Sequence, residues 1–234
     1  GIDSTAVVGL MGEASGRKIQ TYSAGFEDEH RAIDERHYAR IAAKHLNCNL
    51  EEIVVTKKEA SNLFSQLIKD IDQPSIDGTN TWIVSRSASQ SVKVAVSGLG
   101  GDELFAGYPH FYRFAMDKEF SLSHFPMANT ILERIHKIRP NRITLRLLFK
   151  YANTIERMAM LRRVLENFEF NGAVHQKWSK SFREHLIGKQ RNLLRPDADK
   201  VQQTSYSEIN DYLLNTLLRD GDVMSMAHGL EVRP

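Results

Sequence analysis

The segment VKVAVSGLGGDELFAGY, residues 92–108, constrains the fold of this chain more than any other stretch. The apolar run 92–96 reads as a buried strand, and a loop containing Gly98, Gly100 and Gly101 follows it at once. A parallel strand delivers its carboxyl end to the crevice where α/β folds bind ligands. Glycines there let the backbone approach a ligand and present its N–H groups. The segment therefore predicts a strand that ends at a ligand-binding loop.

The first half of the chain alternates helical and strand patterns. Apolar residues recur at helical spacing over 3–14, 34–47, 57–71 and 82–91, and strand-like runs cover 18–26, 50–56 and 92–96. This alternation predicts an α/β fold with a parallel sheet covered by helices on both faces.

After Gly107 the patterns become helical, most clearly over 153–168 and 207–219, with breaks at 141, 171–172 and 195–199. We therefore expect an α/β nucleotide-binding part over 1–110 and a mostly helical part of the same domain over 111–234, with no flexible linker between them.

Composition excludes several classes of protein. Apolar residues make up 41% and charged residues 26%, as in ordinary globular domains, and the formal charge of +2 indicates no nucleic acid or membrane partner. No apolar run is long enough to span a membrane, and no secretory leader is visible. Cys48 is the only cysteine, which excludes an internal disulfide and fits a reducing cytoplasm.

Two acidic residues follow the glycine loop. Asp102 and Glu103 stand where a helix is expected to begin, and Mg²⁺ takes oxygen ligands of this kind and often bridges phosphates. The loop could therefore hold phosphates through backbone donors and a metal through Asp102. The alternative is a tight turn with acidic residues that only stabilise the helix start.

The first residues, GIDST, carry a second indication. Asp3, Ser4 and Thr5 open a predicted helix and could serve a pyrophosphate or its metal. The alternative is an ordinary helix cap formed by Asp3 or Ser4.

Taken together, four segments resemble the synthetase domain of the glutamine-hydrolysing asparagine synthetase family, within the pyrophosphatase-loop group of ATP-cleaving enzymes. The loop S-G-G-x-D-S is matched in its last part by Gly1, Asp3 and Ser4. The signature S-G-x-G-G-D-E-L-F-x-G-Y is matched over 97–108. The family's acidic–proline loop is matched by Asp72, Pro74 and Asp77. The family's segment R-x-x-D-x-x-S-M-A-x-x-x-E-x-R is matched by Arg219, Asp222, Ser225, Met226, Ala227, Glu231 and Arg233.

The resemblance implies a pyrophosphatase-loop fold and an adenylation chemistry. A substrate carboxylate, that of aspartate in the family, attacks the α-phosphate of ATP, and ammonia then displaces AMP to leave an amide. Mg²⁺ is implied at Asp3 and Asp102, and catalytic roles are implied for Asp3, Asp102 and, as a candidate base or a helix cap, Glu103. The implied ATP-binding residues are Gly1, Asp3, Ser4, Ala24, Gly25, Ser97, Gly98, Gly100 and Gly101.

The chain also departs from the family pattern. Leu99 stands where some asparagine synthetases carry a glutamate, which leaves the acceptor carboxylate open. The glutaminase half that would supply ammonia is absent, Cys48 cannot replace its nucleophile, and the strand expected before Gly1 is missing. The resemblance leaves the oligomeric state open, a homodimer included. The chain by itself is expected to be inactive in glutamine-dependent synthesis and weakly stable.

Three functions stay open on the sequence. The first is ATP-dependent amide synthesis on aspartate. The second is the same chemistry on another carboxylate, as in a β-lactam-forming relative or an amidotransferase that modifies a sugar or peptide carboxylate. The third is a non-catalytic nucleotide-binding module. His30, His37 and His45 lack a matching ligand cluster and read as solvent-facing, and the basic run 133–150 reads as a solvated helix face rather than a nucleic-acid surface.

Overall fold

Two parts of the chain that are distant in sequence build one α/β unit. The computed structural model describes residues 1–27, 34–72, 75, 77–116, 131, 134–135, 176–193, 195 and 197–234. The first compact unit joins Gly1–Leu104 with Leu213–Pro234, and the second is Phe105–Tyr212. The predicted division at residue 110 between a nucleotide-binding and a helical part stays a prediction.

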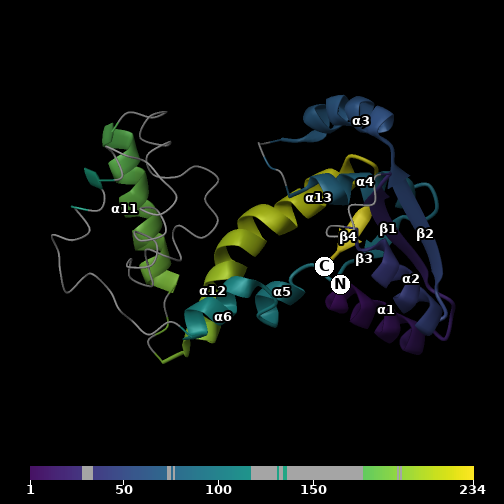
Figure 1. The fold of residues 1–234 in the computed structure, drawn as a ribbon, viewed down its shortest axis with the longest axis horizontal. Helices are drawn as coiled ribbons and strands as arrows, with labels where there is room; N and C mark the ends of the chain where they lie inside the picture. Colours follow the sequence, from purple (N-terminus) through teal and green to yellow (C-terminus); the bar gives the residue numbers. More distant parts are fainter. Residues whose placement is uncertain are drawn as a thin grey trace. The chain divides into compact units, whose positions relative to one another are not determined.

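The first unit alternates helices and strands as the sequence predicts. Its elements are α1 (Ile2–Ser15), β1 (Gln20–Phe26), α2 (Arg36–His45), β2 (Asn49–Val55), α3 (Lys57–Asp70), α4 (Thr79–Ala88), β3 (Val94–Val96), α5 (Gly101–Leu104), α13 (Leu218–Met226) and β4 (Glu231–Arg233). In Figure 1, α1 and α2 lie on one side of β1 and β2, and α4 and α13 lie on the other.

The strands form two parallel pairs. β1 pairs with β2 from Gln20↔Asn49 to Phe26↔Val55, and β3 pairs with β4 from Val94↔Glu231 to Val96↔Arg233. The parallel direction agrees with the predicted α/β class, although the described strands form two small sheets rather than one. β4 was not predicted, because a three-residue strand has too little pattern to be seen without its partner.

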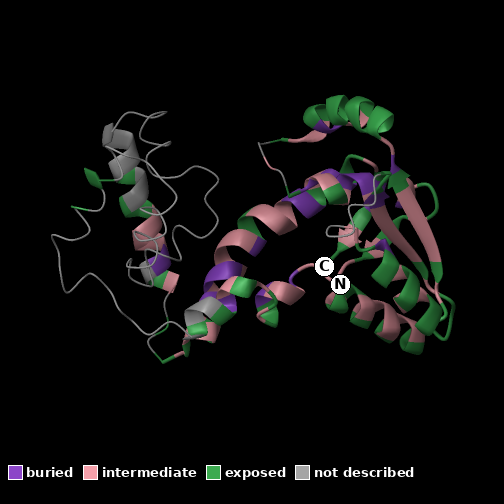
Figure 2. Cartoon of the chain, viewed as in Figure 1, coloured by how far each residue is buried: buried purple, intermediate pink, exposed green. Residues whose placement is uncertain are grey.

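The core of the first unit lies between the β1–β2 pair and three helices. Val55, Leu67, Trp82, Ile83 and Met224 are buried together, with the last of these contributed by α13. Figure 2 shows the buried residues concentrated along α4 and α13. The segment Leu213–Pro234 therefore contributes to the core of the α/β unit.

Trp82 connects this apolar core to two polar residues, Asp70 and His228. Its indole Nε1 donates a hydrogen bond to Asp70 Oδ2 at 2.8 Å, and its ring meets the imidazole of His228 edge-on, with centroids 4.7 Å apart. Burial lowers the pKa of His228 below its usual 6.5. Its Nε2 atom is buried and has no hydrogen-bond partner, so the neutral imidazole is the favoured form.

The second unit buries several polar side chains among its described residues. Its described helices are α6 (Pro109–Met116), α11 (Gln176–Leu193), α12 (Lys200–Glu208) and the first part of the π-helix η2 (Ile209–Leu217), which ends in the first unit. The buried Ser207 donates to Gln190 at 2.6 Å, and Lys189 pairs with Asp211 at 2.5 Å. These contacts link α11 to α12 and to the start of η2, and the buried polar groups of the first contact are hydrogen-bonded to each other.

The predicted helix over 207–219 lies in a helical stretch that runs from Lys200 to Met226, in which the middle turns are π-helical. The predicted break at 195–199 is confirmed, because α11 ends at Leu193 and Asp199 caps α12. The predicted helix 153–168 and the breaks at 141 and 171–172 lie outside the described residues. Within the described part of the chain, no helix combines the length and apolar character that crossing a bilayer requires.

Candidate functional site

The start of α1 lies directly against the glycine loop that follows β3. A Cβ atom added to Gly98 would stand 2.5 Å from the backbone N of Ser4 and 2.8 Å from its Oγ. Such distances are too short for any side chain, so the close approach requires glycine. Two segments almost a hundred residues apart in the sequence therefore meet here.

Asp3 occupies the corresponding space beside Gly101. A Cβ on Gly101 would come within 2.3 Å of Asp3 Cγ and 2.7 Å of its Oδ1. The carboxyl group of Asp3 thus packs over the residue that immediately precedes Asp102. The structure brings Asp3, Ser4, Gly98 and Gly101 together, as a shared nucleotide site requires.

The glycine loop is held in a defined shape. Ser97 donates its backbone N–H to Arg233 O at 2.8 Å, and its Oγ accepts from the N–H of Leu99 at 3.2 Å. Gly98 O accepts from Gly101 N at 3.2 Å, and Gly100 is buried with a φ of 94°. A side chain at Gly100 would be strained in that conformation. The loop is therefore closed on itself, with β4 fixing its first residue.

The start of α1 is a source of backbone donors. The helix is capped by Gly1 without any side-chain hydrogen bond, and Gly1 O accepts from Thr5 N at 3.2 Å and Thr5 Oγ1 at 2.9 Å. The alternative that Asp3 or Ser4 serves as the helix cap is therefore wrong, because both lie inside the first turn. First-turn N–H groups have no acceptor within the helix and are suited to an anion.

The acidic pair begins a short helix, as predicted. Asp102 and Glu103 lie in the first turn of α5, with Asp102 half-buried and Glu103 only 1% exposed. Among the described residues, no group of three histidine, cysteine or acidic side chains forms a metal site by itself. The carboxyl group of Asp3 lies beside Gly101, however, and Asp102 is the next residue in the chain. Two carboxylates completed by phosphate oxygens would suit Mg²⁺.

The matched segment over 71–80, which we call the acidic–proline loop, is hydrogen-bonded to α13 through Asp72 and Ser75. Arg219 Nη2 donates to Asp72 Oδ1 at 2.5 Å, its Nη1 donates to Asp220 Oδ1 at 3.0 Å, and Ser75 Oγ donates to Asp220 Oδ2. Leu99 of the glycine loop lies against Gly221 on the same helix, because a Cβ there would be 3.6 Å from Leu99 Cδ2. Sequence reasoning missed Ser75 and Asp220, since their importance depends on contacts across the fold.

Ala24 and Gly25 stand at the carboxyl end of β1, in the other strand pair. Ala24 packs against the apolar core, while Gly25 is buried on the opposite side of the strand beneath Arg36. Sequence reasoning gave Arg36 no role. An arginine is usually exposed, and nothing in its sequence neighbourhood signals a buried one.

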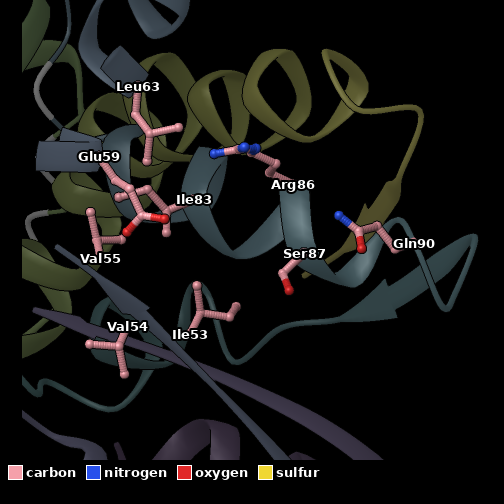
Figure 3. A pocket seen from close by; sticks show the side chains of 9 residues that line it. All are labelled: Ile53, Val54, Val55, Glu59, Leu63, Ile83, Arg86, Ser87 and Gln90. Atoms are coloured by element: carbon pink, nitrogen blue, oxygen red, sulfur yellow. The ribbon is translucent and has the colours of Figure 1, made fainter. Parts of the chain in front are cut away.

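A pocket of about 140 Å³ lies elsewhere, between β2, α3 and α4 (Figure 3). It is lined by Ile53, Val54, Val55, Glu59, Leu63, Ile83, Arg86, Ser87 and Gln90. None of the predicted site residues is among them. The Glu59 carboxylate is engaged in the capping box of α3, accepting from Thr56 N at 3.1 Å and Thr56 Oγ1 at 2.8 Å. This pocket is distinct from the glycine-loop site.

The histidine and basic-run alternatives receive no support from the described residues. His37 and His45 are exposed on α2 and join no metal-binding group, while His30 lies outside the described residues. Of the basic run 133–150, only residues 134 and 135 are described.

Comparison with known proteins agrees with the geometry. Asparagine synthetase (glutamine-hydrolyzing) 1 of Bacillus subtilis is 25% identical over the whole chain, which corresponds to 37% of that protein. A Methanocaldococcus jannaschii protein, provisionally named asparagine synthetase (glutamine-hydrolyzing) 2, is 34% identical over 50% of the chain and 23% of its own length. The chain thus spans well under half of the length of these relatives.

The family described as asparagine synthase matches residues 1–234, the full length of the chain. The four matched segments lie mainly in the first unit. There, the start of α1 contacts the loop after β3, and that loop and the acidic–proline loop each contact α13. This chain belongs to the asparagine synthase family.

Proposed function

We propose that this chain is the ATP-cleaving part of an amide synthetase with a pyrophosphatase-loop fold. In this function it adenylates the side-chain carboxylate of aspartate and transfers ammonia to give asparagine, AMP and pyrophosphate. Ammonia would come from a glutaminase domain like that implied by the names of the relatives. Family membership and the contact between the α1 start and the glycine loop support this proposal.

The single observation that carries the proposal is the packing of Asp3 and Ser4 on Gly98 and Gly101. Each glycine stands where a Cβ would collide with the other segment, so the two segments are in direct contact. Backbone N–H groups from the α1 start and the glycine loop can then face the same triphosphate.

The chain's own residues would act by binding and orientation. In the first step an oxygen of the substrate carboxylate bonds to the α-phosphorus, and the bond from that phosphorus to the bridging oxygen breaks, releasing pyrophosphate. Fixed backbone donors at Ser4 and Gly98 would stabilise the charge that develops on the leaving group. In the second step, ammonia attacks the acyl carbon, AMP leaves, and the nitrogen loses a proton.

Asp3 and Asp102 would hold Mg²⁺ beside the phosphates. When bound, the cation would neutralise charge on the phosphate oxygens. Neither step requires an activated serine, so Ser4 and Ser97 are assigned to binding. Glu103, whose side chain is buried, is a candidate to receive the proton, with a helix cap as its alternative role.

Leu99 favours a second candidate function with a different acceptor. It stands where some asparagine synthetases carry a glutamate, and its side chain lies against Gly221. An apolar side chain there could serve a carboxylate substrate other than aspartate. The adenylation chemistry would be unchanged, and only the carboxylate would differ.

Exchange of labelled pyrophosphate into ATP tests these functions in the full-length protein. Exchange that depends on aspartate supports the first candidate, and exchange with another carboxylate from a panel supports the second. ATP that binds only as a ligand, without exchange for any carboxylate, indicates a non-catalytic nucleotide-binding module.

The role of Asp102 gives a direct prediction. Asp102→Asn should lower the exchange rate by at least about 10³-fold, since a lost metal ligand removes several kcal/mol of charge stabilisation. Asp197→Asn is the matched control, because Asp197 is exposed in the turn before α12. Equal exchange rates for the two variants would exclude a metal role for Asp102.

A further inference from the structure

A buried ion pair covers the end of β1. Arg36 is 5% exposed, and its guanidinium lies on the backbone of Gly25, where an added Cβ would be 2.2 Å from Nε and 2.6 Å from Cδ. Charged side chains are seldom buried without a purpose or a partner. Gly25 therefore leaves room for Arg36, and the two residues form one packed unit.

The guanidinium is held from two sides. Its Nε donates to both carboxylate oxygens of Asp34, at 3.0 and 2.9 Å, and its Nη2 donates to Asp34 Oδ2 at 2.5 Å. Asp34 also accepts from the backbone N of Arg36 at 3.0 Å. These hydrogen bonds from Arg36 lower the pKa of Asp34 to about 2, so the carboxylate is ionised at neutral pH.

The same guanidinium fixes the backbone of the strand end. Nη2 donates to Phe26 O at 3.0 Å, while on the other edge Glu27 N donates to Val55 O at 3.1 Å. The last peptides of β1 are therefore restrained by β2 on one edge and by Arg36 at the terminal carbonyl. Arginine suits this task because its planar fork can bond a carboxylate and a carbonyl together.

We propose that Arg36, locked by Asp34, is a positioning residue that sets the shape of the Ala24–Phe26 backbone for the base of ATP. This inference rests on the proposed function, in which that backbone meets the adenine. Because Asp34 neutralises the guanidinium, the pair is unsuited to attract phosphate. Its effect therefore belongs to the base end of the nucleotide, whereas Asp3 and the glycine loop serve the phosphate end.

The chain offers a matched control for this pair. Arg40, one turn later on α2, makes a similar two-pronged bridge to Glu52 on β2, with Nε–Oε1 at 2.7 Å and Nη2–Oε2 at 2.6 Å. That bridge is more exposed, since the Arg40 side chain is 49% exposed and that of Arg36 only 6%. Arg36→Gln and Arg40→Gln therefore remove the same charge and a similar bridge from the same helix.

The test measures dissociation constants for ATP and for inorganic tripolyphosphate in the full-length protein. Arg36→Gln should raise the constant for ATP about tenfold, the effect of one charge-assisted hydrogen bond, and leave that for tripolyphosphate unchanged. Arg40→Gln should change neither constant. Exchange measured at saturating ATP should keep its maximal rate in both variants, because Arg36 does not touch the reacting atoms.

Arg36→Lys keeps a buried cation beside Asp34 and guards against a folding defect in the glutamine variant. It should also weaken ATP selectively, since an ammonium cannot form the two-pronged bridge and reach the carbonyl together. A parallel loss of ATP and tripolyphosphate binding, or equal ATP constants for the Arg36 and Arg40 variants, would overturn the inference and leave the proposed function standing. A wild-type protein that binds no ATP would overturn both.

Discussion

At the scale of single residues, glycines decide where two segments can touch. Gly98 and Gly101 accept the backbone of Ser4 and the carboxyl of Asp3 at distances that exclude any side chain. Gly25 does the same for Arg36 in the other strand pair. The sequence pattern indicates that the glycine loop is special, but only the fold reveals which atoms fill the space that each glycine leaves.

Gly101 provides a prediction at this scale. Gly101→Ala should lower the pyrophosphate exchange rate by about 10²-fold, because the new methyl group displaces Asp3 by the order of an ångström. Exchange kinetics of the purified variant provide the measurement.

Gly12→Ala is the control for this substitution, since a Cβ on Gly12 meets no atom within 4 Å. Gly12 lies inside α1, so that variant should be more stable by roughly 0.5–1 kcal/mol and unchanged in exchange. A Gly101→Ala variant with the wild-type exchange rate would show that exchange does not depend on the position of Asp3 beside Gly101.

The residue scale also marks the limit of prediction from sequence. Asp3, Ser4, Gly98 and Gly101 could be selected from their motifs, and the structure brings them together. Arg36 and Asp220 could not, because a buried charge is recognisable only through its partners, Asp34 in one case and Ser75 and Arg219 in the other. The motifs predict which segments meet, while the contacts that hold them emerge from the fold.

At the scale of elements, α13 links the site to the core. Its first turn carries Arg219 and Asp220, which hold the acidic–proline loop, and its middle carries Met224, which is 1% exposed against Trp82 and its neighbours. The helix leads directly to β4, whose Arg233 carbonyl receives Ser97 of the glycine loop. One short helix and strand thus support both matched loops.

Two methionines of α13, one buried and one exposed, test whether this helix packs into the core. Met224→Ala should lower the free energy of unfolding by about 2–5 kcal/mol, because it leaves a cavity in the core. Met226→Ala should change it by less than about 0.5 kcal/mol, since Met226 is 55% exposed. Urea unfolding followed by circular dichroism measures both. Similar losses for the two variants would mean that α13 does not pack as described.

Elements were predicted with uneven success. The helices and strands of residues 1–100 follow clear periodicities, so their existence and order could be predicted. β4 could not, because its three residues become a strand only by pairing with β3. The π-helical turns over 209–217 were also missed, since apolar spacing does not separate them from an ordinary helix.

At the scale of the whole molecule, the shifted ionisable groups favour stability at neutral pH. Burial lowers the pKa of His228 in the folded protein below the usual 6.5. The contribution of His228 to the free energy of unfolding is therefore present above pH 6.5. It is lost as the pH falls below that value, because the unfolded chain takes up a proton more readily than the folded one. Hydrogen bonds from Arg36, Arg40 and Thr56 lower the pKa values of Asp34, Glu52 and Glu59, respectively. These three carboxylates contribute to the free energy of unfolding above their ordinary pKa values, 3.8 for aspartate and 4.5 for glutamate, and the contribution is lost at more acidic pH.

The pH range in which His228 affects stability can be separated experimentally from the more acidic range of the carboxylates. The free energy of unfolding of the wild type should decrease between about pH 7 and 5, and His228→Gln should flatten that decrease. His45→Gln is the control, because His45 is exposed at the end of α2. Urea unfolding at a series of pH values measures the slope. Identical slopes for the wild type and both variants would show that His228 does not cause the decrease in the free energy of unfolding.

The first unit is closed by the last segment of the chain, Leu213–Pro234, which supplies a core methionine and the strand beside β3. During synthesis on the ribosome, residues 1–104 emerge before that segment and must wait for it before their hydrophobic surface is covered. A chain broken off before Leu213 would therefore leave β3 without its partner strand and apolar surface exposed, which makes it a target for proteolysis.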